Sequence, residues 1–482
     1  MVLIKQAQII DGSGQKAFRA DILINDGKIS AIGSFPHKKA DVIINALGLD
    51  AVPGFIDVNT DSDHHLSLFT NPSQKDFVHQ GVSTIIGGQC GASLAPLMYG
   101  SLASIKEWAN TDLVNVDWRG VKEFFNILRK INLEIRFETL VGHSTVRMDV
   151  AGGETRDLTE SELQVFSKIL EDSLNEGALG MSTGLGHIYG RRTPYSEIKL
   201  LVNLVAKHGK VYTTHLRDEG VGLLKSIEET VAVAHDTGAK TVISHLRPIR
   251  GFENNFEQAI ELIDKNLVNA NVYFDVNPFE TSLIPLYSLL PSWIQGDKAE
   301  TLLEYLKKDE IRGKIMQEVA GKKLEDLVVV SARNNDHLVG KSLKEIAGSK
   351  EKNVAETVLE LMEATRFVAT LASKNLDAPL LDKALFHPRA LIGSNSASLP
   401  ENTKKMRLER ATSTFLKFLE ISKEHNIPRE EAIKRITFIP AQVFGLKNRG
   451  LIKEGYLADI VLLKDQTVKG VVLNGKYVVN NG

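Results

Sequence analysis

The stretch SEIKLLVNLVAKHGKVYTTH, residues 196–215, contains the unit on which the fold is built. Its apolar residues recur at helical spacing as far as Gly209, and a short β-branched run then leads into His215. Glycine is typical just past a helix C-terminus, because it adopts left-handed backbone angles without strain. The stretch therefore predicts a helix, a turn and a strand with a polar residue at its carboxyl end.

The same unit occurs elsewhere in the chain. Residues 225–245 read KSIEETVAVAHDTGAKTVISH and residues 74–90 read QKDFVHQGVSTIIGGQC, so these strands run into His245 and Cys90. Repeated helix–strand units form parallel sheets, and about eight strands can be counted, which is the number in a (β/α)8 TIM barrel. A doubly wound open sheet is the alternative, but no G-x-G-x-x-G follows the first strand. The predicted fold class is α/β, a (β/α)8 TIM barrel.

The two ends of the chain differ from the middle. Residues 1–50 and 440–482 read as short strands separated by turn signals, including an Asn-Gly hairpin signal in VLNGK. We expect them to form one small β-sandwich domain, with the barrel at residues 51–439. A long stretch at about 284–350 interrupts the barrel pattern and reads as charged amphipathic helices, with Leu302, Leu303 and Leu306 on one side. It is expected to be a packed helical subdomain, or alternatively a lid over the barrel mouth.

Composition excludes several classes of function. The 482 residues carry a net charge of −2, without the basic excess of a nucleic-acid-binding protein. The N-terminal residues do not read as a signal peptide, and no window approaches the roughly 18 apolar residues of a membrane span. The single cysteine, Cys90, fits a reducing compartment. We therefore expect a cytoplasmic protein that acts on a small molecule and contacts neither nucleic acid nor membrane.

Three strand ends carry residues that can bind a metal. In a (β/α)8 barrel the carboxyl ends of the strands meet at one mouth, so Cys90, His215 and His245 should converge there. Each of these residues alone is more often structural, but a thiolate and two imidazoles together are a zinc ligand set that leaves a position open. The sequence thus predicts one zinc ion at Cys90, His215 and His245.

The first barrel strand ends in an unusual polar run, GFIDVNTDSDHH, residues 54–65. His64 and His65 lie past the expected end of the strand, where solvated or supporting residues are more usual than ligands. His143 follows another strand, so a binding role and a structural role are both open. The charged residues after His215 could either pair within their loop or orient His215.

Eight segments carry a family resemblance, in order, over nearly the whole chain: AVPGFIDV, GVSTIIGGQCGASLAP, LVGHSTVR, GALGMSTGL, VYTTHLRDEG, VISHLRP, HPRALIGSN and PAQVFGLKNRGLIKEGYLADIVLL. They resemble the amidohydrolase superfamily and, more narrowly, the N-acyl-D-amino-acid deacylase (D-aminoacylase) family. The resemblance implies a barrel with a small sandwich beside it, a zinc ion on Cys90, His215 and His245, and hydrolysis of a non-peptide amide C–N bond. It also suggests substrate contacts at His143, Ser182 and Arg247, the last in place of a family lysine.

The sequence departs from this family at its other catalytic positions. The family's His-x-His falls on Asn59 and Asp61, and its general-base Asp falls on Asn395. An amide cannot take a proton from water, and loss of a general base typically costs about 10²–10⁴ in rate. The second metal site is therefore expected to be lost, with Asp61 or Asp63 as a replacement base.

Three interpretations follow from these departures. The first is a one-zinc amide hydrolase with a rearranged base, in which Asp61 and Asn395 remain at the reacting centre. The second is a catalytically inactive barrel that binds a ligand or a partner. The third is a non-hydrolytic enzyme that uses Asp61 or His64 for proton transfer. Retention of Cys90, His215 and His245 favours the first, with an N-acyl amino acid as substrate.

Overall fold

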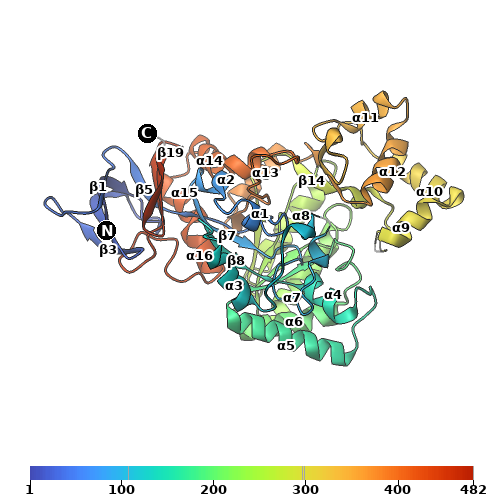
Figure 1. Ribbon diagram of the computed structural model, residues 1–482, viewed down its shortest axis with the longest axis horizontal. Helices are drawn as coiled ribbons and strands as arrows, with labels where there is room; N and C mark the ends of the chain where they lie inside the picture. The colour runs from blue at the N-terminus through green and yellow to red at the C-terminus, as the bar shows by residue number, and fades with distance from the viewer. Residues whose placement is uncertain (107, 296, 298, 481–482) are drawn as a thin grey trace.

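The computed structural model describes residues 1–106, 108–295, 297 and 299–480, and it has three parts along its long axis. A sheet built from both chain ends lies at one extremity, a barrel in the middle, and a mainly helical insert at the other (Figure 1). The N- and C-termini both lie in the part distant from the insert. Among these residues, no helix is long and apolar enough to cross a membrane.

The central part is a closed ring of parallel strands. Neighbouring strands pair in parallel from β6 through β13 to β17, with β8 and β9 as the two halves of one strand. A bridge between Thr60 and Ser396, and the hydrogen bond from Asn395 N to Asn59 O (2.7 Å), join the last strand to the first. The predicted (β/α)8 barrel is confirmed. Its strands are β6 (Phe55–Asp57), β7 (Val82–Gly87), β8 (Arg136–Thr139), β9 (Val141–Gly142), β10 (Gly180–Gly184), β11 (Val211–His215), β12 (Lys240–Ile243), β13 (Val272–Val276) and β17 (Ala390–Ile392).

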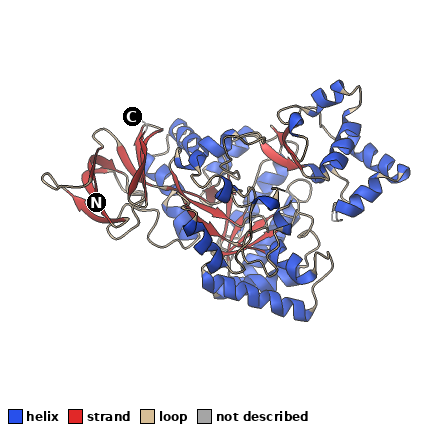
Figure 2. Cartoon of the chain, in the orientation of Figure 1, coloured by secondary structure: helices blue, strands red, loops and turns tan. Residues whose placement is uncertain are grey.

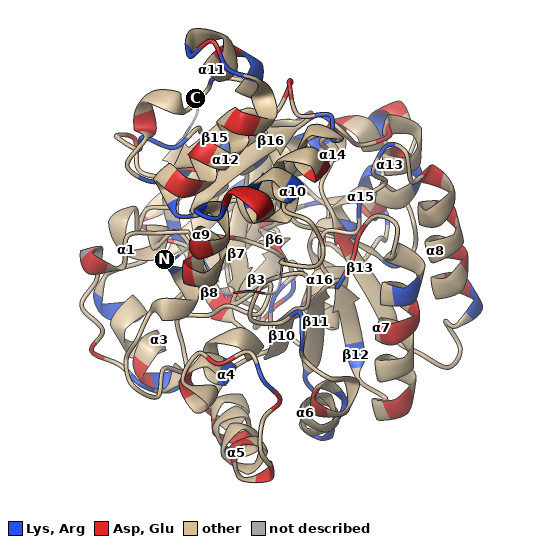
Figure 3. Cartoon of the chain, turned by 90° about the vertical axis from the view of Figure 1, so that its right-hand side faces the viewer, with Lys and Arg blue, Asp and Glu red and all other residues tan. Residues whose placement is uncertain are grey.

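Helices surround the ring of strands (Figure 2), and charged residues recur along these helices (Figure 3). The helix predicted before Gly209 is α6, and Gly209 has the left-handed φ of +65° that ends it. Thr159 caps α5 through a capping box with Glu162, as the sequence indicated. The helices are α1 (Ser67–Thr70), α2 (Lys75–Val78), α3 (Val121–Lys130), α4 (His143–Ala151), α5 (Glu160–Glu176), α6 (Tyr195–Lys207), α7 (Leu223–Thr237), α8 (Glu253–Lys265), α13 (Ala378–Leu385), α14 (Glu409–Glu424), α15 (Arg429–Ile436) and α16 (Phe438–Val443).

The two chain ends meet in one sheet. Strand β5 pairs in parallel with β1 and antiparallel with β18, so it joins the N-terminal strands to the C-terminal ones. Asn474 and Gly475 both have positive φ in the turn between β19 and β20, as an Asn-Gly hairpin requires. The division into domains at residues 50 and 440 stays a prediction. The strands are β1 (Val2–Ile9), β2 (Phe18–Asn25), β3 (Lys28–Gly33), β4 (Val42–Asn45), β5 (Asp50–Pro53), β18 (Ile460–Lys464), β19 (Thr467–Leu473) and β20 (Lys476–Asn480).

The insert lies between β13 and β17 in the sequence and has a hydrophobic core of its own. Leu302 and Leu306 are buried in that core and Leu303 packs against it, in agreement with the amphipathic pattern. The predicted helical stretch begins at residue 296, and residues 296 and 298 lie outside the described residues. A small antiparallel sheet, which the sequence pattern did not indicate, joins the helices. These elements are β14 (Ser282–Pro285), α9 (Ala299–Leu306), α10 (Asp309–Ala320), β15 (Val328–Ala332), α11 (Leu343–Ser349), α12 (Val354–Thr365) and β16 (Ala369–Ser373).

Candidate active site

A cavity of about 420 Å³ lies at the carboxyl ends of the barrel strands. Its volume is within the range of small-molecule sites, and its position is where (β/α)8 barrels carry their chemistry. The barrel and the insert both line it, so the insert forms part of the wall. Its barrel residues include Asp61, Cys90, His187, His215, His245, Arg247 and Asn395, and its insert residues include Ile284, Tyr287, Val330 and Thr370.

The three predicted metal ligands come together in this cavity. His245 Nε2 lies 3.6 Å from Cys90 Sγ and 2.9 Å from His215 Nδ1. Burial lowers the pKa of His215 well below its usual value, so its imidazole is neutral and keeps a lone pair at neutral pH. Burial raises the pKa of the Cys90 thiol, an effect that a nearby metal cation opposes. One sulfur and two imidazole nitrogens are a donor set suited to a divalent metal such as zinc.

Glu219 orients this donor set. Its Oε1 lies 3.0 Å from His245 Nδ1, so it accepts the proton there and leaves the Nε2 lone pair directed at Cys90 and His215. Glu219 also pairs with Arg247. Burial alone would raise the pKa of Glu219, but the charges of Arg247 and His245 hold it well below the usual value. The charged loop after His215 therefore orients the other histidine, His245.

Three residues at the strand ends have left-handed backbones, although none of them is glycine. The φ angles are +51° at Cys90, +40° at His245 and +45° at Asn395. Such conformations cost free energy and are concentrated at functional sites, where the surrounding contacts hold them in place. Around Cys90 the contact comes from Ser182 on β10, whose hydroxyl accepts from Gly91 N (3.0 Å) and donates to Gly88 O. Ser182 is fully buried and does not line the cavity, so its direct contacts fix the Cys90 turn.

A further histidine, which the sequence did not single out, lies beside the predicted metal ligands. The His187 ring is 4.5 Å from the His215 ring between centroids. Among the described residues, Cys90, His187 and His215 form one possible ligand group, and His215, Glu219 and His245 form another. His187 Nδ1 contacts the Tyr287 hydroxyl of the insert, and its buried Nε2 has no hydrogen-bond partner in the described part of the chain. Burial lowers the pKa of His187 to about 4, so it is a neutral base at neutral pH. Only its place in a Gly-rich stretch after β10 could have indicated it.

Of the two candidate bases, only Asp61 reaches the cavity. His64 Nδ1 lies 3.4 Å from Asp61 Oδ1, and His64 Nε2 donates to Ala92 O (3.1 Å). Burial opposes ionisation of Asp61, but its hydrogen bond with His64 and the charges of His64, His65 and Arg410 lower its pKa to about 2. Asp63 is completely buried and accepts from Gly88 N (2.6 Å), away from the cavity lining. His64 is also buried, so of the two roles expected for it, solvated or supporting, its contact with Asp61 fits the supporting one.

Asn59 and Asn395, the two asparagines that depart from the family pattern, differ in whether they reach the cavity. Asn395 lines the cavity, whereas Asn59 is completely buried and donates from Nδ2 to Asp275 Oδ2 (3.1 Å). Burial raises the pKa of Asp275 to about 6 and that of the neighbouring Asp57 to about 7. Asn59 therefore packs against two buried carboxyl groups below the cavity.

His143 lies outside the cavity lining. It is completely buried at the start of α4, and its Nε2 lies 2.8 Å from Glu197 Oε1, which also accepts from Arg147 (3.0 Å). This is the structural role that the sequence left open for His143. Arg247, in contrast, lines the cavity as expected.

Two cations at the cavity were not predicted. Arg410, in the first turn of α14, is 4% exposed, and its Nε and Nη2 have no hydrogen-bond partner within the described residues. Burial lowers its pKa to about 10. Lys405 donates from Nζ to His65 Nδ1 and Trp108 O, both at 2.6 Å, and burial lowers its pKa to about 8. Both residues line the cavity and bring positive charge to its wall.

Comparison with known proteins agrees with these observations. The model of the amidohydrolase family matches residues 318–478. The D-aminoacylase of Alcaligenes xylosoxydans xylosoxydans is 27% identical over 97% of this chain and 88% of its own length. The N-acyl-D-glutamate deacylase of Bordetella bronchiseptica, solved with zinc and a phosphonate that mimics the tetrahedral intermediate, superposes with a TM-score of 0.83 at 24% identity, over 100% of this chain and 96% of that one.

A further solved structure shares this fold. It is a D-aminoacylase with a binuclear metal centre, described as activated by one metal and attenuated by the second. It covers 100% of this chain and 96% of its own, with a TM-score of 0.80 at 24% identity. The resemblance to the deacylases that the motifs indicated is confirmed, and it extends over nearly the whole chain.

Proposed function

We propose that this chain, which is related over nearly its whole length to the D-aminoacylases of the amidohydrolase superfamily, hydrolyses the amide bond of an N-acyl amino acid with one metal ion. The observation that carries this proposal is the convergence of Cys90, His215 and His245 at the cavity. Three donors that meet between strands far apart in the sequence are otherwise difficult to explain, because each would be a lone buried polar group. The relatives named above are deacylases, which supports the same reaction.

The side chains fit a zinc ion. Cys90, His215 and His245 would hold it, with Glu219 fixing the His245 ring, and a zinc held there would supply Lewis-acid activation of water and of the amide carbonyl. Asn59 and Asn395 lack the donors of a second metal centre, which supports a single ion. The neutral imidazole of His187 lies beside this group and can donate to or accept from the substrate amide through Nε2.

Asp61 is the proposed proton acceptor. His64 holds its Oδ1, which leaves Oδ2 to take a proton from the attacking water at the cavity. A carboxylate whose pKa is about 2 is a weak base, so turnover should be slow relative to an enzyme with a better matched base. Asn395 can accept or donate a hydrogen bond at the same place but cannot remove the proton.

The cavity also suits the substrate's charge. An N-acyl amino acid carries an α-carboxylate, and the Nε and Nη2 of Arg410 can bind both oxygens of such a group. A buried guanidinium without a carboxylate partner is costly, and an anionic substrate would relieve that cost. Arg247, held by Glu219, lines the same cavity.

A metal analysis combined with an activity assay tests the proposal. Purified wild-type protein should contain about one equivalent of zinc and release acetate from one or more N-acetyl-D-amino acids. Cys90→Ala should lose the metal and at least about 10³-fold in turnover, because it removes a ligand from the activating ion. Ser93→Ala is a control, since its hydroxyl is also buried near Cys90 but bonds to Ala95 O, away from the ligand group. Wild-type protein without bound metal would contradict the proposal.

The second candidate function is binding without turnover. Asn59 and Asn395 favour it, because both stand where the related deacylases are expected to carry catalytic groups. Zinc with no turnover on any N-acetyl-D-amino acid, in a protein that still binds them, would support this alternative. We also propose a cytoplasmic location on the basis of the single cysteine, and a small β-sandwich domain at residues 1–50 and 440–482.

A further inference from the structure

His187 lies among the donor atoms of the proposed zinc site. One of its ring nitrogens, the sulfur of Cys90 and a ring nitrogen of His215 all lie within 4.8 Å of one another. His245 Nε2 in turn lies 3.6 Å from Cys90 Sγ and 2.9 Å from His215 Nδ1. The ligand atoms of one tetrahedral zinc ion lie about 3.3–3.8 Å apart, as bond lengths of about 2.0–2.3 Å require. The separations here are of similar size, so four side chains, and not three, are within reach of one metal ion.

The nitrogen of His187 that can serve as a ligand is Nε2. The other nitrogen, Nδ1, contacts the Tyr287 hydroxyl, and a proton held on Nδ1 by this contact leaves the lone pair at Nε2. Nε2 is buried and has no hydrogen-bond partner among the residues that the structure describes. A buried polar atom without a partner is costly, and a bound metal ion would remove that cost.

Two glycines allow the backbone to bring His187 to this position. A turn after β10, closed by the hydrogen bond from His187 N to Gly184 O (3.0 Å), folds the chain back over the strand end. A Cβ atom at Gly184 would lie 2.8 Å from His187 Cδ2, and one at Gly186 would lie 2.7 Å from His215 Nε2. A larger residue at either position would therefore crowd an imidazole. The sequence GLGH, residues 184–187, is suited to placing the two rings side by side.

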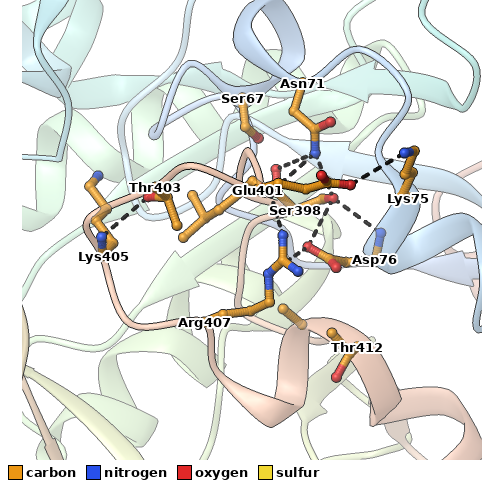
Figure 4. A network of polar contacts seen from close by, with 12 residues as sticks. Ser67, Asn71, Lys75, Asp76, Ser398, Glu401, Thr403, Lys405, Arg407 and Thr412 are labelled. Carbon is orange, nitrogen blue, oxygen red and sulfur yellow. Dashed lines mark hydrogen bonds and ion pairs between the residues drawn. The ribbon is translucent and has the colours of Figure 1, made fainter. Parts of the chain in front are cut away.

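The His187 ring is also supported from the loop that contains Trp108. The indole of Trp108 and the His187 ring form a T-shaped pair with centroids 5.9 Å apart. Trp108 O accepts from Lys405 Nζ (2.6 Å). The loop that carries Lys405 is in turn fixed to the barrel, because Ser398 Oγ donates to Asp76 Oδ2 (3.2 Å) (Figure 4). A side chain that is held in place before binding loses little entropy when it binds.

A fourth donor decides whether a metal in this site has an open position. Catalytic zinc sites keep three protein ligands and one open position, whereas a fourth protein ligand closes the site. We propose that His187 is a fourth, displaceable zinc ligand, which closes the coordination of the ion until another ligand enters the cavity. This inference rests on the zinc site of the function proposed above. Because Tyr287 of the insert contacts Nδ1 of the same ring, the insert takes part in setting how readily the metal site opens.

Cobalt-loaded protein tests this inference without any turnover, because Co²⁺ can take the place of zinc and its absorption spectrum responds to a change of ligands. Azide, a small anion that binds at an open coordination position, is the probe. The wild-type protein should bind azide about tenfold or more weakly than His187→Ala, because the imidazole competes for the position. His187→Ala should also bind zinc about 100-fold or more weakly than the wild type, since a ligand is worth at least as much as the residues that orient it.

Tyr287→Phe is a second variant, which keeps the imidazole and removes only the hydroxyl that contacts Nδ1. It should weaken zinc binding by about tenfold, because partners that orient a metal-bound histidine are typically worth about 10–100-fold. A histidine that is not a ligand would leave the zinc affinity of this variant unchanged. Melting curves show whether His187→Ala is folded, and Tyr287→Phe keeps the test informative if it is not.

His425→Gln is the matched control. His425 also packs against an aromatic ring, that of Phe386 at 4.9 Å between centroids, but it lies outside the cavity lining. Its loss should therefore leave the binding of azide and of zinc unchanged.

The outcomes separate this inference from the deacylase function. Equal azide affinity in wild type and His187→Ala, with unchanged zinc affinity in His187→Ala and Tyr287→Phe, would overturn the inference and leave the deacylase function intact. Weak azide binding that depends on His187, in a protein without turnover, would support the inference and reject the deacylase function. Wild-type protein that binds neither zinc nor Co²⁺ would overturn both.

Discussion

Strand β11 ends at His215, and Cys90 and His245 follow the ends of β7 and β12 within three residues, whereas Asn59 and Asn395 follow the neighbouring strands β6 and β17. In the first group His245 Nε2 lies 3.6 Å from Cys90 Sγ and 2.9 Å from His215 Nδ1, and Glu219 fixes the His245 ring. In the second group the Asn59 amide is buried against Asp275 and Asn395 lines the cavity. The metal ligands and the catalytic base come from different strands of the barrel. The strands β7, β11 and β12 can therefore keep a metal site while the residues after β6 and β17 lose the group that accepts a proton.

The largest expected effect comes from restoring a carboxylate at position 395, after β17. Asn395→Asp should raise kcat on N-acetyl-D-amino acids by about 10²-fold, because a carboxylate can take the proton that an amide cannot. Steady-state kinetics of the zinc-loaded variant measure the effect. Asn395→Ser, which changes the side chain without supplying a base, should give no gain, and an equal gain in both variants would contradict the comparison.

The next effect concerns the predicted zinc site, which Glu219 supports through His245. Glu219→Gln should weaken zinc binding by about 10–100-fold, since the residue that holds a metal-bound histidine is typically worth that much. Competition with a chromophoric chelator gives the zinc affinity directly, independently of turnover. Glu229→Gln, which also removes a carboxylate partner of an arginine but lies farther from the ligands, should leave the affinity unchanged.

The smallest expected effect is a loss of folding stability at low pH, and it comes from His65, in the segment after β6. Burial and the charge of Lys405 lower the pKa of His65 to about 3, below the value of about 6.5 in an unfolded chain. Between these two pKa values the unfolded chain binds more protons at His65 than the folded chain does. The neutral His65 side chain therefore contributes fully to folding stability above pH 6.5, and its contribution declines as the pH falls. At pH 5.5 the loss should approach 1.4 kcal/mol, or about tenfold in the folding equilibrium.

Urea denaturation at pH 7.5 and pH 5.5 measures this contribution. His65→Gln should lose less stability between the two pH values than the wild type, by about 1 kcal/mol, because the glutamine does not titrate. An identical loss in both proteins would show that His65 is not held neutral in the folded state. Since His215 and His187 titrate in both proteins, the difference between them isolates His65.

The sequence predicted the parts of the site that follow a repeated pattern. Cys90, His215 and His245 each end a helix–strand unit, so the fold determines where they meet. Lys405 lies in the long irregular loop after the last barrel strand and Arg410 in the first turn of α14 that follows it, and no periodicity indicates which cations there turn inward. His143 ends a strand as the ligands do, but α4 begins at that residue, so its ring packs against Glu197 instead of the cavity.

The insert was predicted as a packed helical subdomain or, alternatively, as a lid over the barrel mouth, but which of its residues reach the site could not be foreseen. The hydrogen bond between His187 Nδ1 and the Tyr287 hydroxyl arises from two segments 100 residues apart, and only tertiary packing brings them together. The same holds for Asn59, whose partner Asp275 is on another strand. The repeated helix–strand pattern predicts which strand-end side chains reach the barrel mouth. Contacts between segments far apart in the sequence determine the hydrogen-bond partners of each side chain there.

The contact between Tyr287 and His187 has a consequence for protein engineering. A chimaera that replaced residues 286–373 with the corresponding region of a relative would alter the wall of the cavity and also the tautomer of an imidazole beside His215. Exchange of the insert without a matched change at position 187 would therefore leave His187 without its partner in the insert. Barrel and insert must be treated as a single module when substrate preference is redesigned.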